Sequence, residues 1–339
     1  MCAIEMERFI VGTGRCGSTL LSRMIAEQPD VLSVFEFFNG LDMTKRFRRG
    51  PVGGAEVAAL ISQEHPFVTM VLKRGYEVEE ITYPFGPNAR YTRDQGLPWV
   101  LVSTLPRLTD DPDSLFDELV AFARTLPSQG LPDQYEALFG WLAQRLGNRC
   151  WIERSGSSID YLGDLHALYP DARFLHIHRD GHETALSMRE HAAYRLAIYF
   201  LFQMESEGAP TIDELRGLDP AATPSDDDPV SRILASRPPV ELYGKYWSQE
   251  LQNGMPAAGK LHATQYREVR FEDVIARPEE TLRDIADFFD IDPGGGWRAR
   301  AASLVRGVPP TRYDALPADE QERLAGACRP GMQLLGRIR

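Results

Sequence analysis

The hydrophobic pattern at the start of the chain predicts a strand, a glycine-rich turn and a helix. Residues 8–11 form a short apolar run of residue types that favour strands, and three glycines lie in the turn that follows. Apolar residues recur on one face of a helix predicted over residues 18–27. After a Pro-Asp turn, residues 31–35 are again apolar. The pattern predicts a β-α-β unit with parallel strands and a right-handed crossover.

Strands and helices continue to alternate along most of the chain. Further strands are predicted over residues 67–73, 149–154, 173–178 and 263–271, and further helices over residues 160–169, 240–253 and 278–289. Such alternation predicts an α/β fold of three layers, α/β/α, with a central parallel sheet covered by helices on both faces.

Two segments interrupt this alternation. Residues 40–148 are predicted as an elaboration outside the sheet, and residues 207–239, which contain several prolines and three consecutive Asp residues, as an acidic loop. We interpret the 339 residues as a single domain that carries these two additions.

The glycine turn is a candidate anion site. A glycine turn that leads into a helix directs free N–H groups and the positive end of the helix dipole at one point, which most often holds phosphate. The pattern of Gly12, Gly14 and Gly17 fits a dinucleotide fold, in which Glu36 stands near the place of the ribose-binding acid. It also has the glycine spacing of a nucleotide-triphosphate loop, but Ser18 replaces the essential lysine, which argues against Mg²⁺-dependent ATP chemistry.

A third interpretation accounts for more of the chain. Arg15 inside the turn, with Ser18 and Thr19 directly after it, offers a guanidinium, two hydroxyls and backbone donors to one phosphate without a metal. A second anion site is predicted at Arg179, which ends a strand, and Ser187, about two helical turns later. Two phosphate sites on one parallel sheet suit a nucleotide phosphorylated at its 5′ and 3′ positions.

The carboxyl ends of parallel strands form the usual ligand-binding edge of such a sheet. Gly12, Glu36, Arg154 and Arg179 each lie at or just past the end of a predicted strand. We therefore expect these four residues to face one crevice.

Composition limits the cellular location and the binding partners that we expect for this protein. The net charge of −12 argues against nucleic acid or anionic lipid as the main partner. No apolar stretch is long enough for stable membrane insertion, and no signal-peptide pattern opens the chain. The four cysteines lack metal-ligand spacing, so we expect them to be reduced and the protein to be cytoplasmic.

Three motifs, in order, resemble those of the sulfotransferases that use 3′-phosphoadenosine 5′-phosphosulfate (PAPS). G-R-C-G-S-T-L-L at residues 14–21, followed by Q-P-D-V, is similar to their 5′-phosphosulfate loop. F-L-H-I-H-R-D-G at residues 174–181, with L-S-M after it, is similar to their 3′-phosphate motif. R-F-E-D-V at residues 270–274, with Pro278 after it, is similar to their R-Y-E-D-L…P segment. The likeness is closest to the tyrosylprotein, carbohydrate and bacterial small-molecule branches.

The resemblance implies how the donor is bound. Arg179 and Ser187 would hold the 3′-phosphate. The 5′-phosphosulfate would be held by Arg15, Cys16, Gly17, Ser18, Thr19 and Leu20.

The resemblance also implies catalytic roles for Glu36, Arg15 and Arg154. Glu36 would be the general base, and Arg154 would touch the transferring sulfuryl group together with Arg15. Alternatives stay open for two of them. Glu36 would bind a ribose in a dinucleotide fold or serve only as a salt-bridge partner, with a histidine as the alternative base. Arg154 would form a salt bridge with Glu153 or Asp160.

The implied reaction moves a sulfuryl group from PAPS to an acceptor hydroxyl and leaves 3′,5′-ADP. No metal is expected, because arginines and helix dipoles supply the positive charge. The acceptor, a small molecule, lipid or glycan, would bind in a pocket built by residues 40–148 and 207–239, and a homo-oligomer stays open. The alternatives are an NAD(P)-dependent Rossmann oxidoreductase and a nucleotide-binding protein without catalysis.

Overall fold

The computed structural model describes residues 6–76, 78–87, 89–202, 210, 222, 224–225 and 227–338. The chain divides into two compact units. The first comprises Met1–Ile61, Asp117–Asp180 and Gln249–Pro310, and the second comprises Ser62–Phe116, Gly181–Ser248 and Thr311–Arg339.

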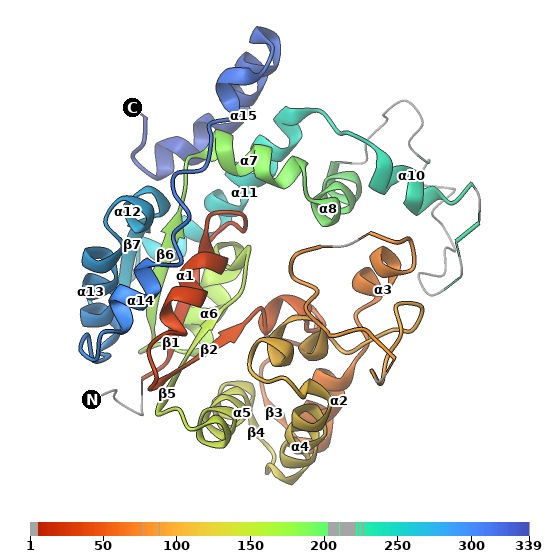
Figure 1. The fold of residues 1–339 in the computed structure, drawn as a ribbon, viewed down its shortest axis with the longest axis vertical. Helices are drawn as coiled ribbons and strands as arrows, with labels where there is room; N and C mark the ends of the chain where they lie inside the picture. The colour runs from red at the N-terminus through yellow and green to blue at the C-terminus, as the bar shows by residue number, and fades with distance from the viewer. Residues whose placement is uncertain are drawn as a thin grey trace. The chain divides into compact units, whose positions relative to one another are not determined.

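The first unit is built on a five-stranded sheet in the order β2-β5-β1-β6-β7 (Figure 1). The strands are β1 (Arg8–Val11), β2 (Val31–Phe35), β5 (Cys150–Arg154), β6 (Arg173–His178) and β7 (Tyr266–Arg270). All neighbouring strands are parallel, as predicted. However, β1 and β2 are not neighbours, because β5 from later in the chain lies between them.

Helices cover both faces of this sheet. On one face, Ile10, Ile152 and Leu175 belong to a buried core shared with α1, α12, α13 and α14. On the other face, the Phe9 ring stacks on Phe174 at 5.4 Å between centroids, and the α5 ring of Phe139 packs on the strand residue Trp151 at 4.9 Å. This arrangement confirms the predicted three-layer α/β/α class.

The helices of this unit are α1 (Ser18–Ile25), α2 (Gly54–Ser62), α5 (Leu131–Leu146), α6 (Leu162–Leu168), α12 (Phe271–Ala276), α13 (Pro278–Phe289) and α14 (Trp297–Ala302), with a short antiparallel pair β3 (Pro51–Val52) and β4 (Gln129–Gly130).

The described part of the second unit contains helices joined by loops, with an isolated bridge between Glu64 and Pro98. Helices α4 (Pro112–Thr125) and α11 (Val240–Ala258) contribute residues to both units. The other helices are α3 (Pro66–Leu72), α7 (Gly181–Arg189), α8 (Ala192–Phe202), α10 (Pro229–Ala235) and α15 (Ala318–Leu334).

The predicted strand over residues 67–73 is wrong, because these residues form α3. Pro66 occupies the start of the helix, where its missing N–H costs nothing. The Nδ1 atom of His65 accepts a hydrogen bond from the Val68 N–H at 3.3 Å and so caps the helix. The apolar run alone did not distinguish a buried helix from a buried strand.

The predicted loop over residues 207–239 is wrong for residues 229–235, which form α10. The Asp228 carboxylate accepts the Ser231 N–H at 2.6 Å and caps this helix, and Pro229 begins it. Much of the remaining predicted loop lies outside the described residues.

The prediction that every cysteine is reduced is wrong for Cys150, which is disulfide-bonded. Cys16 and Cys328 carry buried thiols. Disulfide pairing depends on which residues the fold brings within about 6 Å, a property that sequence spacing does not show. Cysteine content therefore does not support a cytoplasmic location. Among the residues described, no helix combines the length and apolar character needed to cross a membrane.

A buried ion pair joins two distant segments of the second unit. Arg74 donates from Nε to Asp228 Oδ2 at 2.5 Å and from Nη2 to Oδ1 at 2.7 Å, and their side chains are 1% and 5% exposed. This fork-shaped contact holds the start of α10 against the end of α3.

We expect Asp228→Ala to destabilise the protein by about 3–5 kcal/mol, because it leaves the Arg74 guanidinium buried without its counterion. Asp319→Ala is the control, since it removes an exposed pair with Arg323 and should cost at most about 1 kcal/mol. Urea unfolding of both variants measures the difference. Equal losses of unfolding free energy would show that the buried pair stabilises the protein no more than the exposed pair does.

Candidate active site

The turn between β1 and α1 has the backbone of an anion-binding loop. Gly14, Arg15 and Gly17 all have positive φ, at 69°, 48° and 93°. The N-cap residue of α1, Gly17, forms no side-chain cap, and the Ser18 N–H forms a hydrogen bond with the Cys16 thiol. A left-handed arginine is uncommon, and such backbone strain tends to occur at binding sites.

Close packing also requires glycine at two positions of this turn. A Cβ atom at Gly12 would lie 2.7 Å from Cys16 Sγ and 2.8 Å from the Ile177 carbonyl oxygen. A Cβ atom at Gly17 would lie 2.0 Å from Cδ2 of Phe271, the first residue of α12. The turn is therefore pressed against β6 and α12.

The Phe271 ring brings the two predicted anion-binding segments together. Its edge packs on Gly17, and the Arg179 guanidinium carbon lies 5.0 Å from its ring centroid. The Asp180 N–H also donates to Glu272 Oε1 at 3.1 Å, which ties the end of β6 to α12. The R-F-E-D-V motif thus links the turn at Arg15 to Arg179. The sequence motif alone indicated no role for the phenylalanine.

The other predicted donor-binding residues lie on two elements. Cys16 is fully buried, and this burial raises the pKa of its thiol, so it lines the turn as a packing group. Ser18 is buried, whereas Thr19 and Leu20 are half-buried in the first turn of α1. Ser187 is buried on α7, in the second unit.

Glu36 directly follows β2 and is 5% exposed. Its φ of 54° lies in the left-handed region. Its Oε1 atom pairs with Arg154 Nη1, and its Oε2 atom accepts hydrogen bonds from the Gly156 N–H at 3.0 Å and from Asn39 Nδ2 at 2.7 Å. The Tyr161 hydroxyl in turn donates to Asn39 Oδ1 at 2.9 Å and holds the Asn39 side chain. Together these contacts hold the Glu36 carboxylate in one orientation.

Arg154 connects Glu36 to helix α1. It ends β5, its side chain is 1% exposed, and its guanidinium carbon lies 3.6 Å from the Phe35 ring centroid. Its Nε atom donates to Ser22 Oγ in α1 at 3.1 Å. Its Nη2 atom is buried and has no hydrogen-bond partner among the residues described. A buried donor without an acceptor is costly, so this nitrogen is suited to an anionic oxygen supplied by a ligand.

The ion pair of Arg154 differs from the salt-bridge alternatives drawn from the sequence. Its partner is Glu36 rather than Glu153 or Asp160, and Asp160 instead accepts from Asn253 Nδ2 at 2.7 Å. The reason is sheet register, since Phe35 in β2 pairs directly with Arg154 in β5. The site also includes four residues that were not predicted from the sequence: Asn39, Gly156, Tyr161 and Phe271. The signals that could have indicated some of them were the short spacing from Glu36 to Asn39 and the S-G-S-S run after β5.

The histidines considered as alternative bases have other contacts. His176 is fully buried, which lowers its pKa to about 3, and its Nδ1 atom lies 2.6 Å from the Tyr266 hydroxyl. His65 caps α3, and burial lowers its pKa to about 4. His182 stacks on Tyr313 at 4.4 Å between centroids. These contacts favour Glu36 as the candidate base.

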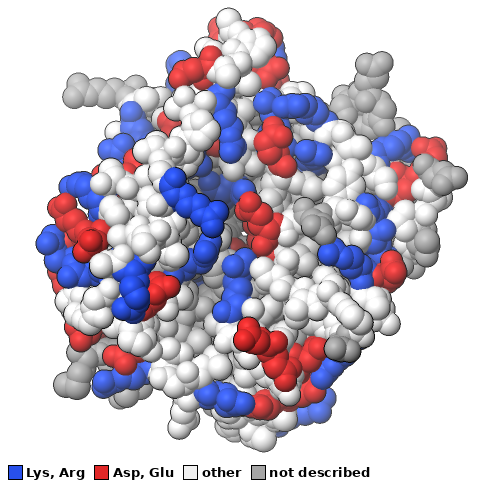
Figure 2. Space-filling view, in the orientation of Figure 1, with Lys and Arg blue, Asp and Glu red and all other residues white. Residues whose placement is uncertain are grey.

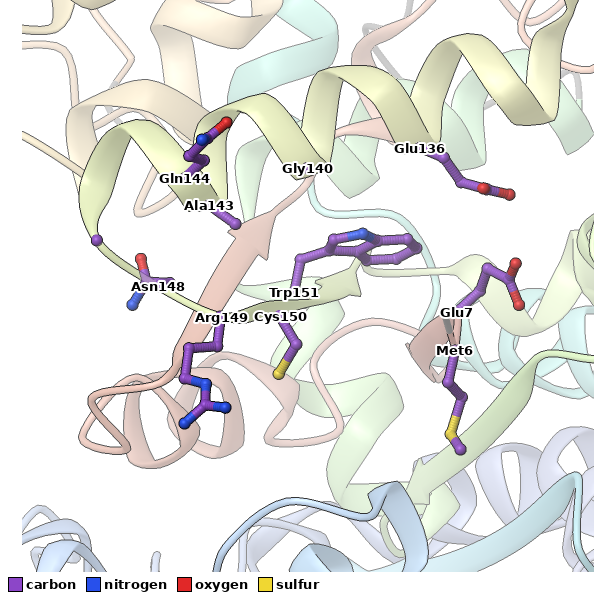
Figure 3. Close-up of a pocket in the computed structure, with 11 residues that line it drawn as sticks. Met6, Glu7, Glu136, Gly140, Ala143, Gln144, Asn148, Arg149, Cys150 and Trp151 are labelled. Atoms are coloured by element: carbon purple, nitrogen blue, oxygen red, sulfur yellow. The ribbon is translucent and has the colours of Figure 1, made fainter. Parts of the chain in front are cut away.

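A cavity of about 630 Å³ lies at the opposite end of the sheet, beside α5 and the start of β5 (Figure 3). Glu7 and Glu136 lie near the Trp151 ring within it. Burial, reinforced by Glu7, raises the pKa of Glu136 to about 7. Because Cys150 begins β5 and Arg154 ends it, this cavity is separate from the candidate active site.

Surface charge is mixed on the face shown in Figure 2, where basic and acidic side chains are interspersed. The candidate active site contains several positively charged groups. In the first unit these are Arg15, Arg154 and Arg179, together with the amino end of α1.

The sequence matches the model of the Sulfotransferase family over residues 103–207 and 232–293. The match covers the second and third motifs and agrees with the family resemblance predicted from them. The matched segments contain Arg154, Arg179 and Ser187, whereas the glycine turn and Glu36 precede them. No curated protein matches the sequence.

Several solved sulfotransferases are similar to this chain. The sulfotransferase domain from the curacin biosynthetic pathway is 14% identical, with a TM-score of 0.47 over 96% of this chain and 98% of that domain. The sulfotransferase STF9 from Mycobacterium avium is 17% identical, with a TM-score of 0.45 over 98% of this chain and 77% of that one. A mouse sulfotransferase complexed with PAP is 11% identical, with a TM-score of 0.39 over 99% and 90%.

We expect Gly17→Ala to destabilise the protein more than Gly50→Ala. Both glycines have nearly the same positive φ, 93° and 92°, but a Cβ atom at Gly50 meets nothing within 4 Å. Gly50→Ala therefore adds only backbone strain of about 1–2 kcal/mol, whereas Gly17→Ala adds an overpacking cost of about 1–3 kcal/mol against Phe271. Denaturant unfolding compares the two, and equal losses would argue against the packing of Phe271 on the turn.

Proposed function

We propose that this protein, whose sequence matches the sulfotransferase family, transfers a sulfuryl group from PAPS to an acceptor hydroxyl. The observation that carries the proposal is the buried Arg154, which is paired with Glu36 on one side and leaves Nη2 without a partner among the residues described. The uncapped N-terminus of α1 and the left-handed turn at Arg15 supply the accompanying phosphate-binding groups.

In the proposed reaction the acceptor oxygen attacks the sulfur in line with the leaving phosphate oxygen. A new S–O bond forms, the bond between sulfur and the 5′-phosphate oxygen breaks, and its electron pair stays on 3′,5′-ADP. Glu36 takes the proton of the acceptor hydroxyl. Arg154 and Arg15 stabilise the charge that grows on the sulfuryl and phosphate oxygens.

The remaining groups bind the donor. The backbone N–H groups of Gly17 and its neighbours, with the Ser18 and Thr19 hydroxyls, would hold the 5′-phosphate. Arg179 and Ser187 would hold the 3′-phosphate. The proposal assigns no metal, because these cationic and dipolar groups supply the charge.

We propose an acceptor with a hydroxyl on a small molecule, lipid or glycan, bound by residues 40–148 and 207–239. This assignment treats both units as one catalytic domain. The dinucleotide alternative is less favoured, because the sequence matches the Sulfotransferase family over residues 103–207 and 232–293.

The first test is ligand binding. We expect 3′,5′-ADP to raise the melting temperature, with a stabilisation of about 2.7 kcal/mol at a hundredfold excess over Kd, and NAD⁺ and ATP to have smaller effects. Arg15→Ala and Arg179→Ala should each weaken 3′,5′-ADP about tenfold or more, since each removes a charge-assisted contact. Arg23→Ala, an exposed position on α1, is the control. Stabilisation by NAD⁺ or ATP but not by 3′,5′-ADP would contradict the proposal.

The second test is turnover of PAPS labelled in the sulfuryl group, with a panel of phenols, sterols and sugars as acceptors. We expect Glu36→Gln to lower kcat by about 10²–10⁴-fold while 3′,5′-ADP still binds, because the variant loses the base but keeps the donor-binding loop. Glu280→Gln, an exposed substitution outside the proposed acceptor-binding segments, should leave kcat unchanged. Retained turnover in Glu36→Gln would remove Glu36 as the base.

A further inference from the structure

The turn that carries Glu36 is held in place from outside its own strand. A glutamate in the left-handed region needs surrounding contacts that maintain this backbone. On one side, the Glu36 N–H donates to the Arg154 carbonyl oxygen at 2.8 Å. On the other side, the contacts come from the residues that flank Arg154 in the sequence.

Glu153 and Ser155 bind the two residues that follow Glu36. The Phe38 N–H donates to Ser155 Oγ at 3.1 Å, and Ser155 Oγ donates to Glu153 Oε1 at 2.6 Å. The Phe37 N–H also forms a hydrogen bond with the Glu153 carboxyl group. The chain of hydrogen bonds therefore runs from the buried end of β5 to the backbone of the Glu36 turn.

Glu153 is 1% exposed and forms no ion pair within the described part of the chain. Side chains alternate along β5, so it projects to the opposite face of the sheet from Arg154. The charges of Glu36 and Arg154 influence the pKa of Glu153, and the charge of Glu153 influences the pKa values of Tyr161 and Tyr169.

We propose that Glu153, together with Ser155, is a positioning residue that holds the turn so that Glu36 faces Arg154. The inference rests on the proposed function of Glu36 as the general base. Glu153 touches no reacting atom in this proposal. It acts only through the backbone of Phe37 and Phe38.

Protonation gives this arrangement a pH dependence. Burial raises the pKa of Glu153 to about 8, while the hydrogen bond from Ser155 opposes the rise. A glutamate with a raised pKa in the folded state binds its proton more tightly there than in the unfolded chain. Its contribution to stability is therefore complete below about pH 4.5 and is lost as the pH rises through about 8. Above that pH a second buried negative charge lies near Glu36.

The test compares Glu153→Gln, Glu153→Ala and Ser155→Ala. Glutamine is neutral at every pH and keeps an acceptor for Ser155. We expect the wild type to lose melting temperature between about pH 4.5 and 8 and to lose kcat as the pH rises through about 8. We expect Glu153→Gln to retain kcat at pH 7 and to show neither loss. Glu153→Ala and Ser155→Ala should lower kcat at least tenfold with an unchanged Kd for 3′,5′-ADP. Unchanged kcat in Glu153→Ala, or the same alkaline fall in Glu153→Gln, would overturn the proposal.

A double-mutant cycle separates this inference from the proposed function. The unfolding free energies of Glu153→Ala, Glu36→Gln and the double variant are measured by urea denaturation, which needs no donor or acceptor. Coupling through the turn predicts non-additive losses, whereas additive losses would overturn the positioning role. If the wild type neither binds 3′,5′-ADP nor turns over PAPS, the proposed function fails and the cycle still decides whether Glu153 positions Glu36.

Discussion

The buried ion pair between Glu36 and Arg154 is the interaction on which the candidate active site depends. It joins the ends of the neighbouring strands β2 and β5, and the hydrogen bond from Arg154 to Ser22 extends it to α1. A buried charge pair is tolerated only where further hydrogen bonds satisfy its remaining atoms. Glu36 meets this condition through Gly156 and Asn39. Arg154 does not, and its remaining nitrogen is the group that an anionic ligand would satisfy.

Packing of the glycine turn is the second constraint. Gly17 leaves room for the Phe271 ring, and the same ring lies beside Arg179, so one aromatic side chain connects segments about 160 residues apart in the sequence. Helix α12 thereby fixes where the N–H groups of the turn point. A dense interior makes this positioning rigid, and a phosphate site needs such rigidity because its donors must converge on one group.

Much of the first unit was predictable because its signals are local. The apolar runs of β1, β2, β5 and β6, and the glycines before α1, are set by residue types within a few positions. The α3 helix was mispredicted because seven apolar residues fit a buried strand or a buried helix equally well. The disulfide at Cys150 and the partner of Arg154 were not predictable, because both depend on contacts between residues far apart in the chain.

The sequence by itself determined the α/β class, the position of the glycine turn before α1 and the residue types available for chemistry. Periodicity and turn chemistry are properties of neighbouring residues, so they can be recognised without the fold. Only the tertiary structure decided that β5 lies between β1 and β2, and thus that Arg154 meets Glu36 rather than Glu153 or Asp160. Strand order and register set which side chains are neighbours, and they arise from the burial of the whole sheet between two layers of helices.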